Sequence, residues 1–118
     1  MEALDIALEA AKAADRKKAY DIKILEVGKL SDSFDYFVIA SVNNDRQADA
    51  VIDEVENKMR ESYAVRPLAI EGRRVSQWKL IDFGSVMVHI FDEETRDFYR
   101  LEKLWGDAPQ IAFEAELI

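Results

Sequence analysis

The feature that most constrains the fold of this chain is an uninterrupted apolar run at residues 36–40, Tyr-Phe-Val-Ile-Ala. Aromatic and β-branched side chains favour a strand, and a strand without a polar face is covered on both sides. We therefore expect residues 36–40 to form a central strand of a sheet. Helices packed on that sheet would supply the cover.

Two helices are predicted on either side of this strand in the sequence. Residues 3–18 repeat small and apolar side chains at helical spacing and contain no glycine or proline. After N-cap candidates at residues 43–45, a second amphipathic helix of about five turns is predicted, ending before Arg66-Pro67. Its apolar face consists of Ala48, Val51, Ile52, Val55, Met59 and Tyr63.

Further strands are predicted over residues 21–27, 68–70, 75–82 and 86–91. The short Phe83-Gly84-Ser85 segment joins the last two runs, which indicates a β-hairpin. Alternation within the first arm places Trp78, Leu80 and Asp82 on one face.

A last helix is predicted to open with the run of acids that starts at Asp92. Phe98, Leu101 and Trp105 then lie on one side of it, and we expect Phe98 and Trp105 to belong to the core. A glycine and a proline shortly after Trp105 end this helix.

These elements predict a single α/β domain with a mixed β-sheet and flanking helices. The chain of 118 residues shows no internal repeat and no linker. We assign residues 1–108 to the domain. Residues 109–118 are acidic and apolar, and we expect them to form a loose C-terminal tail.

Composition excludes several classes of function. With 24 acidic and 16 basic residues, the net charge of −8 repels nucleic acid and anionic membranes and favours a basic protein partner. The absence of cysteine excludes disulfides and thiol nucleophiles and suits a cytosolic protein. An acidic N-terminus argues against a signal peptide, and no apolar run approaches the ~20 residues of a membrane span.

A magnesium-dependent, nucleotide-binding enzyme is one possible function. Asp32 and Asp35 precede the central strand and Asp82 ends another, and nucleotidyltransferases hold magnesium with acids on adjacent strands. Such enzymes also need a Gly-Ser loop for phosphates, and this chain, with four glycines, has none. Turn and strand-start roles for these acids are the simpler interpretation, and the enzyme remains the alternative hypothesis.

The single histidine, His89, has two interpretations. It could act as a general base, or it could be a structural residue that is hydrogen-bonded within the sheet. Its position between Val88 and Ile90, in the middle of a strand, favours the structural role.

Large aromatic residues in the C-terminal half suggest a protein-binding surface. Trp78, Phe83, Tyr99 and Trp105 are interspersed with acids such as Asp82. Aromatic anchors are enriched at binding hot spots, although core packing is the alternative reading. Trp78 is flanked by polar neighbours near a hairpin end, so we expect it to be more exposed than Trp105.

A set of short motifs resembles the ribosomal silencing factor family, also called RsfS or Iojap-like, from about residue 3 to about residue 108. The motifs are Lys18-Ala19, Asp21-Ile22, residues 35–39, Arg46-Gln47, Glu71-Gly72, residues 78–84, 88–91, 96–99 and 101–105. Their order and spacing carry the resemblance. Ser41-Val42-Asn43-Asn44 replaces the family's Thr-Gly-x-Ser turn, and Ser85 replaces an acid in its hairpin.

The resemblance implies a nucleotidyltransferase-like fold that lacks the catalytic loop. It also implies a cytoplasmic, non-enzymatic repressor of translation that needs no cofactor and forms a homodimer when free. Such proteins bind the large ribosomal subunit through ribosomal protein uL14 and block its association with the small subunit. No sequence-specific contact with nucleic acid is expected.

On this basis we expect one surface to bind the ribosomal protein. Trp78, Leu80, Phe83 and Tyr99 would supply apolar burial. Glu71, Asp82 and Glu102 would complement lysines and arginines on the partner.

Overall fold

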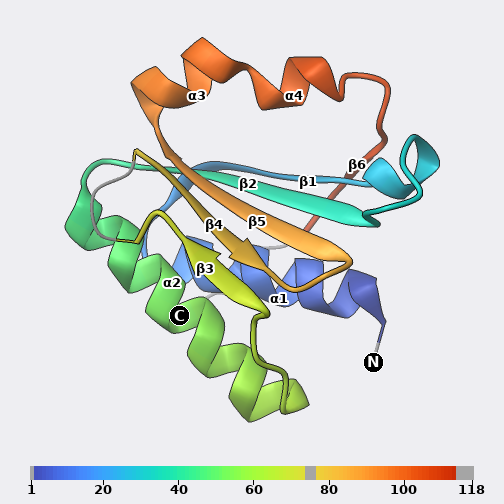
Figure 1. Ribbon diagram of the computed structural model, residues 1–118. Helices are drawn as coiled ribbons and strands as arrows, with labels where there is room; N and C mark the ends of the chain where they lie inside the picture. Colours follow the sequence, from blue (N-terminus) through green and yellow to red (C-terminus); the bar gives the residue numbers. More distant parts are fainter. Residues whose placement is uncertain (1, 74–76, 114–118) are drawn as a thin grey trace.

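The computed structural model describes residues 2–73 and 77–113, which form a six-stranded mixed sheet with helices on both faces (Figure 1). The order across the sheet is β3-β4-β5-β2-β1-β6. The strands are β1 (Tyr20–Leu25), β2 (Tyr36–Val42), β3 (Ala69–Glu71), β4 (Trp78–Asp82), β5 (Val86–Asp92) and β6 (Gln110–Ile111). The predicted start of the hairpin at residue 75 lies outside the described residues.

The apolar run at residues 36–40 forms the interior strand β2, as predicted. It pairs in parallel with β5 and antiparallel with β1, and all its residues after Tyr36 are buried. The other pairings in the sheet are antiparallel, including the predicted hairpin of β4 and β5. Gly84 in the hairpin turn has a φ of 87°, a conformation that favours glycine.

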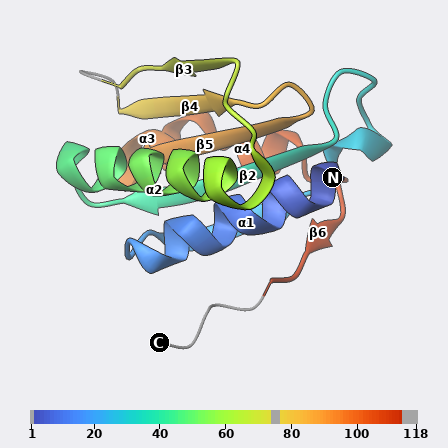
Figure 2. The ribbon, with the colours of Figure 1, turned by 90° about the horizontal axis from the view of Figure 1, so that it is seen from below.

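Helices α1 (Ala3–Arg16) and α2 (Asp45–Tyr63) lie side by side on one face of the sheet (Figure 2). The Asn44 side chain caps α2 by accepting a hydrogen bond from the Gln47 N–H at 2.8 Å, which confirms the predicted start. The alanines of α1 and the predicted apolar face of α2 are buried against β2 and β5. A 3-10 turn, η1 (Val27–Lys29), follows β1.

Helices α3 (Glu93–Tyr99) and α4 (Leu101–Leu104) cover part of the opposite face (Figure 1). The prediction of one continuous helix was wrong, because Arg100 adopts a left-handed conformation with a φ of 49° and ends α3. Phe98 lies before the break, whereas Leu101 and Trp105 lie after it. The Phe98 side chain is 79% exposed, so its predicted place in the core was also wrong. Leu101 is buried and Trp105 partly buried, in contact with Phe37.

The segment after the last helix is not wholly a loose tail. Gln110 and Ile111 form the edge strand β6, which pairs with Ile24 and Leu25 of β1. Phe113 packs against the core beneath α1 and α2. The prediction of a tail starting at residue 109 is therefore wrong for these residues, while residues 114–118 lie outside the described part. No helix of the described chain is long and apolar enough to span a bilayer.

Candidate functional site

One face of β4 gathers four of the residues predicted to bind a partner. Trp78 belongs to the cluster under α4, whereas Ile81 belongs to the core beneath α1 and α2. Because side chains alternate along a strand, Leu80 and Asp82 share the Trp78 side of the sheet. Glu71 of β3 pairs with Leu80 and faces the same way. We call Trp78, Leu80, Asp82 and Glu71 the β4 face.

Helix α3 brings Tyr99 to this face. The Tyr99 ring centroid lies 4.9 Å from that of Trp78, and Phe91 of β5 lies 4.9 Å from Trp78 as well. Tyr99 remains 52% exposed and Trp78 is partly exposed. Residues 21 positions apart in the sequence therefore form one aromatic cluster at the surface, on the same face of the sheet as Glu71 and Asp82.

His89 supports Trp78 from beneath. The Trp78 Nε1–H donates a hydrogen bond to His89 Nδ1 at 3.1 Å. Burial lowers the pKa of His89 to about 4, so the imidazole is neutral at physiological pH. The structural interpretation of His89 is confirmed, since the ring is 5% exposed and hydrogen-bonded within the sheet.

The structure places Phe83 elsewhere and engages Glu102 and Asp82 in contacts within the molecule. Phe83 packs against the core on the α1 and α2 side of the sheet. Glu102 of α4 binds the buried guanidinium of Arg96 at 2.6 Å. The Asp82 carboxylate accepts a hydrogen bond from the Gly84 N–H at 2.7 Å, which stabilises the hairpin turn.

Arg96 is a site residue that the sequence analysis missed. Its side chain is buried, and its Nη1 donates to the Ser41 hydroxyl at 2.7 Å while Nε donates to Glu102. These bonds attach α3 and α4 to the end of β2, and they thereby place Tyr99 over Trp78. A serine at the end of an otherwise apolar strand was the signal, because a buried hydroxyl needs a partner.

The pKa of Glu102 reflects this arrangement. Partial burial would raise it, but hydrogen bonds from its own backbone N–H and from Arg96 outweigh burial, so the pKa lies below its usual value. Glu102 is therefore ionised at neutral pH and is engaged inside the molecule. A contact with a partner would use the carboxylate's remaining exposed oxygen surface.

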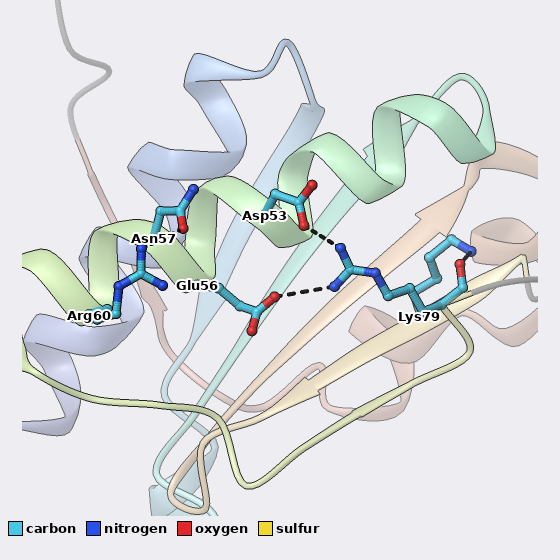
Figure 3. Close-up of polar contacts among 6 residues, drawn as sticks. Asp53, Glu56, Asn57, Arg60 and Lys79 are labelled. Carbon is cyan, nitrogen blue, oxygen red and sulfur yellow. Dashed lines mark hydrogen bonds and ion pairs between the residues drawn. The ribbon is translucent and has the colours of Figure 1, made fainter.

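A second polar network holds the start of β4 against α2. Lys79 points away from the β4 face and is 1% exposed, and its Nζ donates to the Gly72 and Arg73 carbonyls at 2.9 and 2.8 Å. The Arg73 guanidinium in turn binds Asp53 and Glu56 of α2 (Figure 3). The strand that carries Trp78 thus begins at a fixed position.

The described residues offer little support for a metal site. Asp35 precedes β2 and Asp82 ends β4, so both lie at one edge of the sheet. Asp35 is exposed, and the Asp82 carboxylate is engaged by Gly84. Within residues 2–73 and 77–113, no group of three His, Asp or Glu side chains could hold a metal ion.

The fold and this surface define an α/β domain that presents an aromatic and acidic face of its sheet. The model of the family described as "Ribosomal silencing factor during starvation" matches residues 1–117. The chain belongs to this ribosomal silencing factor family, which confirms the resemblance noted in its motifs.

Individual relatives agree with this assignment. The chain is 41% identical over 100 residues to ribosomal silencing factor RsfS of Bacillus subtilis, covering 85% of this chain and 84% of the relative. It is 34% identical to the chloroplastic protein Iojap of Zea mays, covering 93% of this chain and 47% of that longer protein. A crystal structure of a Chromobacterium violaceum protein superposes with a TM-score of 0.84 at 32% identity, covering 98% of this chain and 95% of the other.

Proposed function

We propose that this protein binds the large ribosomal subunit through ribosomal protein uL14 and represses translation by preventing the small subunit from joining. The observation that carries the proposal is the aromatic cluster of Trp78 and Tyr99 at the start of β4, on the same face of the sheet as Glu71 and, at the far end of the strand, Asp82. Partly exposed tryptophan and tyrosine are typical anchors of protein interfaces.

The repression would be steric. The molecule measures 34 × 33 × 29 Å, which is large enough to occupy space that the small subunit needs at the intersubunit surface. The mechanism needs no catalytic residue and no cofactor. The nucleotidyltransferase-like fold without a catalytic loop, which the family resemblance implies, belongs to the same proposal.

Charge would direct the protein to its site. A net charge of −8 repels the phosphates of ribosomal RNA and disfavours binding away from a basic protein surface. Glu71 and Asp82, on the same face of the sheet as the aromatic cluster, would attract lysines and arginines of the partner, which speeds encounter. Apolar burial of Trp78, Leu80 and Tyr99 would then supply most of the affinity.

We further propose a homodimer in the absence of ribosomes and a cytoplasmic location, where ribosomes are found. Tyr99, Phe98 and Leu104 expose apolar surface on α3 and α4, and exposed apolar patches are often covered by self-association. Measuring the mass of the free protein by light scattering tests the dimer, and a monomer at every concentration would contradict it.

The central experiment is co-sedimentation with purified large subunits, with small subunits as the control, followed by subunit joining in vitro. We expect binding to large subunits only, and a block of joining. Trp78→Ala should abolish binding while circular dichroism shows a folded chain. Failure of the unaltered protein to bind large subunits at moderate salt would overturn the proposal.

Asp82 needs a substitution that separates its charge from its role in the turn. Asp82→Asn keeps an oxygen that can accept from the Gly84 N–H but removes the negative charge. Asp82→Ala removes both. If the charge contacts the partner, Asp82→Asn weakens binding and makes it less dependent on salt. Unchanged binding of Asp82→Asn would exclude Asp82 from the interface.

A further inference from the structure

We propose that His89 is the positioning residue of the binding surface, and that its Nδ1 holds the Trp78 indole in the orientation that engages the partner. The inference rests on the proposed function and deepens it. His89 would not itself touch the partner, because it is only 5% exposed.

The geometry of the sheet places the two rings together. Trp78 of β4 pairs with Phe91 of β5, and Leu80 pairs with His89, so His89 lies diagonally across the strand pair from Trp78. All of these side chains project from the same side of the sheet. The two ring centroids are 5.9 Å apart, and the indole Nε1–H reaches His89 Nδ1 at 3.1 Å.

The ring contacts of Trp78 restrain its orientation less sharply than a hydrogen bond does. Phe91 and Tyr99 contact Trp78 through apolar ring surfaces at 4.9 Å each. Such contacts are weakly directional, and the torsion about the Cβ–Cγ bond of an aromatic side chain has broad minima. A hydrogen bond from Nε1 is directional, and it selects one orientation of the ring.

The protonation state of His89 points to the same role. Because Nδ1 accepts a hydrogen bond, the ring proton of the neutral imidazole lies on Nε2. Nε2 is buried and has no hydrogen-bond partner among the described residues. A buried donor without a partner lowers stability, so an apolar residue would suit this position better if packing alone mattered. The bond to Trp78 explains why a histidine is there.

An oriented indole favours binding for a physical reason. A side chain that is already held in its bound orientation loses less conformational freedom when the complex forms. Loss of the bond should therefore weaken association even though Trp78 and its apolar area remain. This effect differs from that of Trp78→Ala, which removes the contact itself.

The test uses a matched pair of variants, His89→Asn and His89→Leu. The two replacements have similar size and shape, but only asparagine presents an oxygen close to the place of Nδ1. We expect His89→Leu to bind large ribosomal subunits about five- to tenfold more weakly, the equivalent of one hydrogen bond, and His89→Asn to recover most of that loss. Equal affinities of the two folded variants would overturn the proposal.

A spectroscopic measurement checks the bond without ribosomes. The Trp78 indole N–H resonance, assigned with a Trp105→Phe variant, should shift upfield in His89→Leu and stay near its original position in His89→Asn. An indole N–H that is unchanged in His89→Leu would also overturn the proposal. If the unaltered protein fails to bind large subunits, the proposed function fails, and this spectrum still decides whether His89 holds Trp78.

Discussion

Arg96 Nε lies 2.6 Å from the Glu102 carboxylate, and this ion pair spans the break between α3 and α4. The same guanidinium binds Ser41 at the end of β2. One buried side chain thus links both short helices to the sheet. The position of Tyr99 over Trp78 depends on this link.

Glu102→Ala should lower the free energy of unfolding by about 2–3 kcal/mol, because it leaves the buried Arg96 charge with only the more distant carboxylate of Asp21, at 3.8 Å. Urea denaturation measures the change. Asp107→Ala, which alters an exposed acid close by, is the control and should change stability by less than about 0.5 kcal/mol. Equal stability of the two variants would show that the ion pair contributes nothing.

Truncation of two phenylalanines should change the free energy of unfolding by very different amounts. Phe91→Ala removes a fully buried ring beside Trp78 and should cost about 3–5 kcal/mol. Phe98→Ser replaces a ring that is 79% exposed in the single chain and should change the stability of the monomer by less than about 0.5 kcal/mol. Thermal or urea unfolding of both variants, at a protein concentration where the chain is monomeric, checks this, and a large loss in Phe98→Ser would contradict the exposure of Phe98 in the monomer.

Lys79→Met should destabilise the protein by about 2 kcal/mol, because the Gly72 and Arg73 carbonyls lose their common donor. Hydrogen exchange should also quicken near the start of β4, because this strand loses its links to the Gly72 and Arg73 carbonyls and to Asp45 of α2. Lys29→Met, at an exposed position, is the matched control. Unaltered exchange in Lys79→Met would contradict a tethering role.

Stability should fall as the pH drops from about 6.5 toward 4, because the folded protein keeps His89 neutral while the unfolded chain takes up a proton. The folded pKa is the lower one, so this contribution is complete above the unfolded pKa and is lost on acidification. The slope is about 1.4 kcal/mol per pH unit. Urea unfolding gives the free energy of unfolding at pH 7 and at pH 5. Between these two pH values the unaltered protein should lose about 2 kcal/mol more than His89→Leu does, and equal losses in the two proteins would refute the assignment.

Local pattern was sufficient for the central strand and the two long helices. Residues 36–40 have no polar face, and α2 has an apolar stripe preceded by a capping Asn44, so these elements follow from side chains close together in the sequence. The alternation in β4 likewise predicted that Trp78, Leu80 and Asp82 share one face. Partners far along the chain were not needed for these conclusions.

The features that the sequence analysis missed depend on distant partners. The break at Arg100 accompanies the attachment of Arg96 to Ser41, which lies 55 positions earlier, and it separates the exposed Phe98 from the buried Leu101. The strand β6 exists because β1 offers a free edge. Helix spacing alone cannot detect either effect.

The sequence by itself therefore determined the α/β class, the main elements and the family of this protein, because periodicity and motif order are local properties. Only the tertiary structure decided which aromatic residues meet. It joined Tyr99 to Trp78, placed Phe83 on the opposite side of the sheet and set His89 Nδ1 against the indole. The physical reason is that strand register and buried charge pairs, which act across the whole sheet, fix those contacts.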